Sequence, residues 1–91
     1  MNQSVLFSDM KTWDEQRQSI YFTAQQGGAL IDCWINKAGL EALSQKPVLD
    51  GPQAIQRFEE CRFDIEDLAQ EQIEDEAYNE AGEIEVIISL A

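Results

Sequence analysis

The feature that most constrains the fold is a pair of alternating apolar patterns on either side of two adjacent glycines. Within residues 19–36, every second side chain before and after the glycines is apolar. A period of two is typical of β-strands with one buried face, and glycine supplies the positive φ angles of tight turns. With the tip at Gln26-Gly27, Phe22 lies opposite Ile31 and both apolar sets share one face. The sequence therefore predicts a β-hairpin.

Two helices are predicted after the hairpin. Asn36 caps a short one over residues 37–45, and Asp50, with Pro52 in the first turn, begins a longer one over residues 52–75. The longer helix carries an apolar stripe at three- and four-residue spacing, made of Ala54, Ile55, Phe58, Cys61, Ile65, Leu68, Ala69 and Ile73. Such a stripe is typical of an amphipathic helix that packs one face on a core.

Alternation returns over residues 83–90 and predicts a last strand. The order β-β-α-α-β indicates an α+β fold, in which a small antiparallel sheet has both helices packed on one face. We expect the last strand beside the first hairpin strand, with the second hairpin strand at the edge. A chain of 91 residues has room for one core, so residues 1–91 are predicted to form a single domain. The N-terminal segment, residues 1–18, fits no clear pattern.

The charge balance excludes several classes of function. Six basic against eighteen acidic residues give a net charge of −12, and the chain has no histidine. It therefore lacks an imidazole for a general base, a catalytic triad or a metal site. Direct nucleic-acid binding is disfavoured because it needs clustered Lys and Arg. Residues 59–91 carry −11 of the total charge, but their spacing matches no metal-binding loop or cofactor motif.

The two cysteines and the N-terminus bear on the compartment. Cys33 and Cys61 are 28 positions apart and form no Cys-x-x-Cys motif, so neither a disulfide framework nor a zinc site is indicated. The N-terminus does not read as a signal peptide, and no apolar stretch approaches the roughly 20 residues of a membrane span. We expect a cytoplasmic protein with reduced thiols and no membrane contact.

One candidate interaction surface is the acidic face of the longer helix, which includes Glu59, Glu60 and Asp67. This face is either a solvated surface that keeps the protein soluble or a site for a basic partner; weak, nonspecific binding of divalent ions is a third reading. Phe63 projects into the same acidic face. It is either a contact residue for a partner or covered by residues 1–18.

The second candidate surface is the face of the sheet that the helices leave uncovered. Tyr21 and Trp34 are predicted to lie there, with Leu30 and Ile87, although such a face is normally polar. Either residues 1–18 cross this face and bury it, or it is a protein–protein surface, most simply in a two-fold homodimer.

An enzymatic role has little support in the sequence. Cys33 and Cys61 both fall on predicted buried faces, where a thiol is inert. Arg62 is either the ion-pair partner of a nearby acid such as Glu66 or a clamp for an anion. The composition favours a non-enzymatic interaction or regulatory module with no cofactor. The alternative is a nucleic-acid mimic whose carboxylates occupy the groove of a basic protein; a small enzyme is third.

A set of residues spread along the chain carries a family resemblance. They are Trp13, Ile20-x-Phe22-x-Ala24, Gly27-Gly28, Cys33-x-Ile35, Leu40 and Phe58-x-x-x-Arg62-x-x-Ile65-Glu66-x-x-Ala69. In order and spacing they resemble the DUF1488 family, short bacterial proteins with a domain of unknown function. The resemblance implies a small cytosolic α+β domain of proteobacterial type and brings no established activity. The chain departs from the family pattern at Gly39, inside the first helix, and at Cys61, where a polar residue is commoner.

Overall fold

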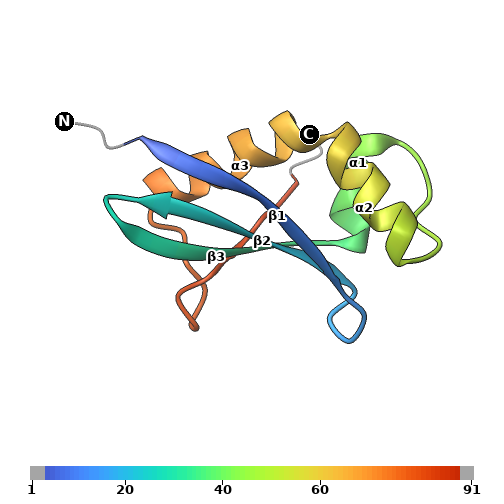
Figure 1. Cartoon of the computed structure of the whole chain (residues 1–91), viewed down its shortest axis with the longest axis horizontal. Helices are drawn as coiled ribbons and strands as arrows, with labels where there is room; N and C mark the ends of the chain where they lie inside the picture. The colour runs from blue at the N-terminus through green and yellow to red at the C-terminus, as the bar shows by residue number, and fades with distance from the viewer. Residues whose placement is uncertain (1–3, 89–91) are drawn as a thin grey trace.

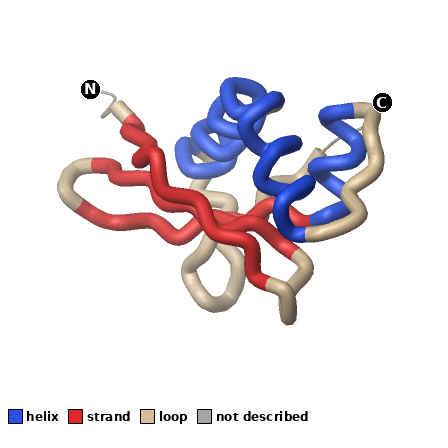
Figure 2. The backbone as a smooth tube through the Cα atoms, turned by 45° about the vertical axis from the view of Figure 1, so that its right-hand side comes forward, coloured by secondary structure: helices blue, strands red, loops and turns tan. Residues whose placement is uncertain are grey.

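The protein is a four-stranded sheet with three helices on one of its faces (Figure 1). The computed structural model describes residues 4–88. In chain order the elements are β1 (Val5–Asp14), β2 (Ser19–Gln26), β3 (Ala29–Asn36), α1 (Lys37–Ser44), α2 (Gly51–Glu60), α3 (Arg62–Glu74) and β4 (Ile84–Glu85). Figure 2 shows the helices gathered on one side of the strands. The predicted α+β class is confirmed, with one strand and one helix more than predicted.

β2 and β3 form the predicted hairpin, but its register differs by two residues from the predicted one. Gly27 and Gly28 alone make the turn, with φ angles of 58° and 83°. A type I′ turn requires positive φ at both central positions, which two glycines adopt without steric cost. The predicted tip is wrong because it puts a glutamine at one of these positions. A shift by two keeps every side chain on its face, so Phe22 still faces the core but lies opposite Cys33 rather than Ile31.

The N-terminal segment forms an edge strand of the sheet, so the alternative in which it crosses the uncovered face is wrong. β1 pairs antiparallel with β2. The register shifts between Phe7 and Lys11, so residues 8–10 lie opposite Thr23 alone. The hydroxyls of Ser8 and Thr23 share a hydrogen bond of 2.9 Å inside this bulge. Bulges are a common means of keeping an edge strand from pairing with another chain.

Both predicted helix caps are confirmed. The backbone N–H of Gly39 donates to Asn36 Oδ1 at 2.8 Å, which closes the first turn of α1. At the start of α2, the N–H of Gln53 donates to Asp50 Oδ1 at 2.9 Å. Each side chain satisfies a donor that a helix N-terminus otherwise leaves without a partner.

The single helix predicted over residues 52–75 is wrong, because the chain bends at Cys61 (φ −111°, ψ 15°) and continues as a separate helix. The N–H of Cys61 still donates to the carbonyls of Arg57 and Phe58, and its carbonyl accepts from the N–H of Ile65, so Cys61 links the two helices. A straight helix of this length would span about 36 Å, whereas an eight-residue strand spans about 27 Å. The bend keeps both halves of the apolar stripe on the sheet.

The last strand is shorter than predicted and lies elsewhere in the sheet. β4 contains two residues and pairs parallel with β3 through Cys33–Ile84 and Trp34–Glu85. The predicted position beside the first hairpin strand is wrong because β1 already occupies that edge of β2. The sheet is therefore mixed rather than antiparallel. The end of the predicted strand, beyond residue 88, lies outside the described residues.

The core lies between the sheet and the helices, as the apolar patterns predict. Its buried apolar members are Val5, Ile20, Phe22, Ala24, Ile31, Cys33, Ile35, Leu40, Val48, Ala54, Phe58, Cys61, Ile65, Ala69, Ile73, Ile84 and Val86. Phe22 and Phe58 meet edge to face at its centre, with ring centroids 5.2 Å apart. Within residues 4–88 no helix has the length and hydropathy needed to cross a membrane.

Candidate binding surfaces

Phe63 is the most exposed large apolar side chain among the described residues, with 80% of its surface accessible. It lies in the first turn of α3, directly after the bend, on the side turned away from the sheet. The alternative that the N-terminal segment covers it is wrong. Phe7 packs instead near Phe22, with ring centroids 6.3 Å apart, and Trp13 lies against Gly51 at the start of α2.

Phe63 stands on a face of α3 that carries four exposed carboxylates. We call this the acidic face; its members are Phe63, Asp64, Asp67, Glu71 and Glu74. At 100° per residue all five fall within about 100° of arc. None of the four carboxylates takes part in an ion pair within residues 4–88. Their charges are therefore uncompensated around an exposed aromatic ring.

Glu59 and Glu60, the other predicted acidic contacts, are already paired within the chain. Glu59 forms an ion pair with Lys11 of β1. Glu60 lies 3.5 Å from both Lys46 and Arg57. These two carboxylates attach α2 to β1 and to Lys46. Of the three predicted acidic contact residues, Asp67 is therefore the one without an ion-pair partner within residues 4–88.

Arg62 is held between two carboxylates. Its Nη2 donates to Asp9 Oδ1 at 2.6 Å and its Nε donates to Glu66 Oε2 at 3.0 Å. The hydrogen bond from Arg62 lowers the pKa of Asp9, and those carboxylates in turn raise the pKa of Arg62. Arg62 therefore joins α3 to the bulge of β1, which matches the ion-pair alternative rather than the anion clamp.

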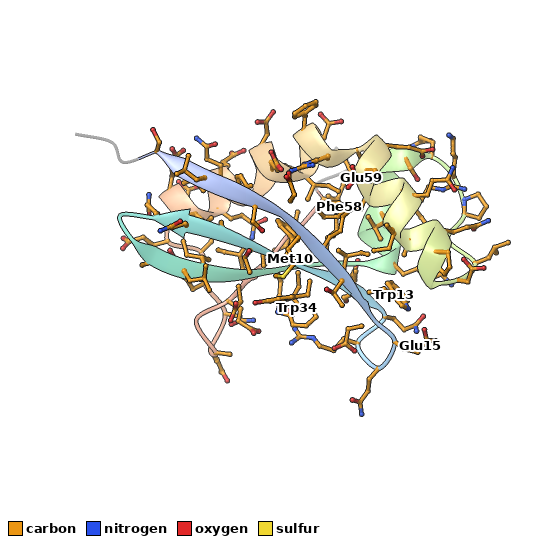
Figure 3. All side chains as sticks on the ribbon, in the orientation of Figure 1. Met10, Trp13, Glu15, Trp34, Phe58 and Glu59 are labelled. Carbon is orange, nitrogen blue, oxygen red and sulfur yellow. The ribbon has the colours of Figure 1, made fainter. Side chains whose placement is uncertain are left out.

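The second predicted surface is the outer face, the side of the sheet that carries no helix. In Figure 3, Trp34 lies on the opposite side of the sheet from Phe58 and Glu59. Tyr21 and Trp34 are cross-strand partners there, with ring centroids 5.0 Å apart. The structure thus places the predicted contact residues on two separate surfaces, one on the helices and one on the outer face of the sheet.

Charged residues of the chain itself engage both aromatics of the outer face. The hydroxyl of Tyr21 donates to Asp32 Oδ1 at 2.5 Å, and this hydrogen bond raises the pKa of Tyr21 to about 12. The guanidinium of Arg17 stacks on Trp34, with its central carbon 3.5 Å from the ring centroid. Such stacking is a cation–π contact. Both rings are half-buried as a result.

Two carboxylates approach the stacked guanidinium from the C-terminal part of the chain. Glu83 and Glu85 each have an oxygen 3.7 Å from an Arg17 nitrogen. Sequence reasoning missed this arrangement, because Arg17 and the two glutamates are far apart in the chain and the position of β4 was predicted wrongly. The alternation at the last strand does, however, place Glu83 and Glu85 on its outward side.

Comparison with known proteins adds the family. A model of the family described as "Protein of unknown function (DUF1488)" matches residues 5–86. The chain belongs to the DUF1488 family. It is 30% identical over 83 residues to the "Uncharacterized protein YrdB" of Escherichia coli (strain K12) and to that of Shigella flexneri, covering 90% of this chain and 94% of each relative.

A solved DUF1488 structure confirms the fold. It is the crystal structure of a family member of unknown function from Shewanella loihica PV-4, and it is 46% identical to this chain. The two align with a TM-score of 0.88 over 94% of each chain. The resemblance found in the sequence is thus confirmed, and the names of these relatives carry no activity.

The cysteines of this DUF1488 protein lie in environments that suppress reactivity. Both thiols are free and buried. Burial raises the pKa of Cys33 to about 12 and also raises that of Cys61, so both are protonated at neutral pH and poorly nucleophilic. No cluster of carboxylates and thiols suited to holding a metal ion occurs in the described part of the chain.

Proposed function

We propose that the protein is a non-catalytic interaction module that binds a basic protein through the acidic face of α3. The observation that carries the proposal is Phe63, which is 80% exposed among carboxylates that have no counter-ion within residues 4–88. A cytoplasmic location is part of the proposal and is supported by the two free thiols.

The two components of this surface have different physical roles. An exposed aromatic ring is costly to leave in water and is the kind of side chain that dominates binding energy when a partner's pocket covers it. The carboxylates attract a basic surface over about 10 Å and set orientation and association rate more than final affinity. The expected partner therefore has an apolar pocket with Lys and Arg around it.

The nucleic-acid mimic is the alternative that shares this surface. A mimic presents negative charge in a row, and four exposed carboxylates along α3 satisfy that requirement. It has no need of an aromatic ring at the centre of the row. The role of Phe63 thus distinguishes the two functions.

The experiment uses a photo-crosslinking amino acid at position 63 and, as a control, at position 49. Leu49 is similarly exposed but lies outside the acidic face. We expect a partner captured at position 63 and not at position 49, identified by mass spectrometry. Equal capture at both positions, or only abundant basic proteins that high salt removes, would contradict the proposal.

Affinity for the purified partner then separates the functions. We expect Phe63→Ala to weaken binding about 30-fold, the magnitude of a hot spot of about 2 kcal/mol, while Leu49→Ala has no effect. Binding that survives Phe63→Ala and is abolished by Asp67→Asn with Glu71→Gln would indicate the mimic. Capture of a second copy, with a dimer in sedimentation, would replace the basic partner by a homodimer.

A further inference from the structure

The outer face contains a site built from two aromatic rings and two carboxylates, which we call the cation cage. Its members are Tyr21, Trp34, Glu83 and Glu85. The Trp34 ring is the floor of the cage, Tyr21 packs beside it, and the glutamates lie at its rim. Aromatic rings combined with carboxylates are the usual means by which proteins bind organic cations.

The cage is held in shape by backbone interactions rather than by its occupant. Tyr21 and Trp34 are paired residues of β2 and β3. The loop before β4 is closed by Asn79, whose Oδ1 accepts from the N–H of Glu83 at 2.9 Å and whose own N–H donates to the Glu83 carbonyl at 2.8 Å. Glu85 belongs to β4, opposite Trp34. Because the backbone of the site is held, binding has to order only side chains.

The guanidinium now in the cage is loosely held. Arg17 belongs to the four-residue turn between β1 and β2, and 40% of its side chain is exposed. Its two ion pairs are 3.7 Å long, beyond hydrogen-bonding distance. A guanidinium has five N–H donors that favour bidentate contact with carboxylates at about 2.7–2.9 Å. Arg17 therefore stacks on the Trp34 ring but makes no hydrogen bond to the carboxylate of Glu83 or Glu85.

The indole N–H of Trp34 is a donor, so it can bind a carbonyl oxygen of an entering chain but not a guanidinium. Its Nε1 is buried and has no hydrogen-bond partner within the described residues. Trp34 also lines a hollow of about 200 Å³ together with Ser19, Asn36, Glu85, Val86 and Ile87. A chain entering beside Arg17 would find this hollow next to the cage.

We propose that the cation cage receives an arginine side chain of a partner protein, and that Arg17 is its exchangeable occupant in the free molecule. A guanidinium is already seated on the Trp34 ring, two carboxylates of complementary charge lie within 3.7 Å of it, and neither makes a hydrogen bond with it. The cage lies on the opposite layer from the acidic face, so the inference is independent of the proposed function.

The test follows the two indole N–H signals in ¹H–¹⁵N NMR spectra, assigned with a Trp13→Phe variant. N-acetyl-arginine amide is the probe, and the citrulline analogue is its neutral control of the same shape. If Arg17 fills the cage about nine-tenths of the time, its removal lowers the apparent dissociation constant about tenfold. We therefore expect Arg17→Gln to bind the arginine probe about tenfold more tightly than the unaltered chain, with saturable movement of the Trp34 signal alone.

The matched control neutralises the two carboxylates of the cage. In the Arg17→Gln background, Glu83→Gln with Glu85→Gln should abolish the response. The proposal is overturned by equal affinities with and without Arg17, by a citrulline response equal to that of arginine, or by tighter binding of tetramethylammonium, which would indicate an alkylammonium site. Titration of the unaltered chain decides the matter if Arg17→Gln is unstable, because a saturable Trp34 shift supports the proposal and its absence refutes it.

Discussion

Gly51 and Trp13 make the contact by which the N-terminal strand holds the second helix. A Cβ atom added at Gly51 would lie 2.7 Å from Cδ1 and 3.2 Å from Nε1 of Trp13. Rotation of the indole away from this position would also disturb the hydrogen bond that its Nε1 donates to Glu15 Oε2 at 2.6 Å. Gly51→Ala therefore forces either the ring or the start of α2 to shift.

The expected cost follows from two opposing terms. Overpacking of this kind costs about 1–3 kcal/mol. Replacing glycine by alanine returns less than the roughly 0.5–1 kcal/mol of a helix interior, because Gly51 is the first residue of α2. The net loss is about 1–2 kcal/mol. For a domain of this size that lowers the melting temperature by about 5–15 °C.

Urea unfolding of a double-mutant cycle tests the cause as well as the size. In a Trp13→Ala background the obstacle is gone, so Gly51→Ala should be neutral or stabilising and the coupling energy should be about 1–3 kcal/mol. Gln56→Ala, an exposed change on the same helix, should stay within about 0.5 kcal/mol. Additive effects of the two substitutions, or an unaltered midpoint for Gly51→Ala alone, would refute the reasoning.

Two further predictions concern titrating groups. The pKa of Tyr21 is raised from 10.0 to about 12 by its hydrogen bond to Asp32, so its contribution to stability is complete below pH 10 and is lost as the pH rises through 12. Urea midpoints of the unaltered chain should therefore fall more between pH 10 and 12 than those of Tyr21→Phe; parallel curves would contradict this. Because Cys33 and Cys61 are buried with raised pKa values, we expect both to react with a disulfide reagent only at the rate of unfolding, and rapid native labelling of either would contradict that.

The sequence predicted the local elements that depend on nearby residues. Three features depend on residues close together in the sequence, and the sequence pattern predicts each of them: the hairpin, the two helix caps and the inward-facing apolar stripe. The register error shows the limit of this reasoning. A turn at Gln26-Gly27 and one at Gly27-Gly28 both leave each side chain on the same face of the sheet. Only the positive φ angles of Gly27 and Gly28 select the second.

The sheet order could not be derived in the same way. β1 lacks regular alternation because its bulge inserts residues 8–10 opposite a single partner, and an irregular edge strand resembles a loop in sequence. Once β1 is missed, the free edge of β2 appears available for the last strand. The wrong position of β4 is therefore a consequence of the bulge and not an independent error.

The candidate sites were predictable to different degrees. Phe63 was evident because a single aromatic residue interrupts an acidic helix face, a pattern that lies within one element. The cation cage combines residues of β2, β3, β4 and the loop before β4, and its occupant Arg17 comes from the turn after β1, so these charged groups meet only through the tertiary structure. A stacked Arg17 has no sequence signature of its own, whereas Tyr21 and Trp34 stand out in the sequence because an exposed sheet face is normally polar.

The bend at Cys61 connects these observations. It directs α3 so that its inner side reaches the C-terminal strand, where Gln72 Nε2 donates to the carbonyl of Glu85 and Gln72 Oε1 accepts from the N–H of Ile87, both at 2.9 Å. The side chain of Gln72 thereby takes the place that a further strand would have in holding a two-residue β4 on the sheet. The same helix turns Phe63 outward at its first turn. α3 thus carries the acidic face on one side, and on the other it fixes the backbone that positions a carboxylate of the cation cage.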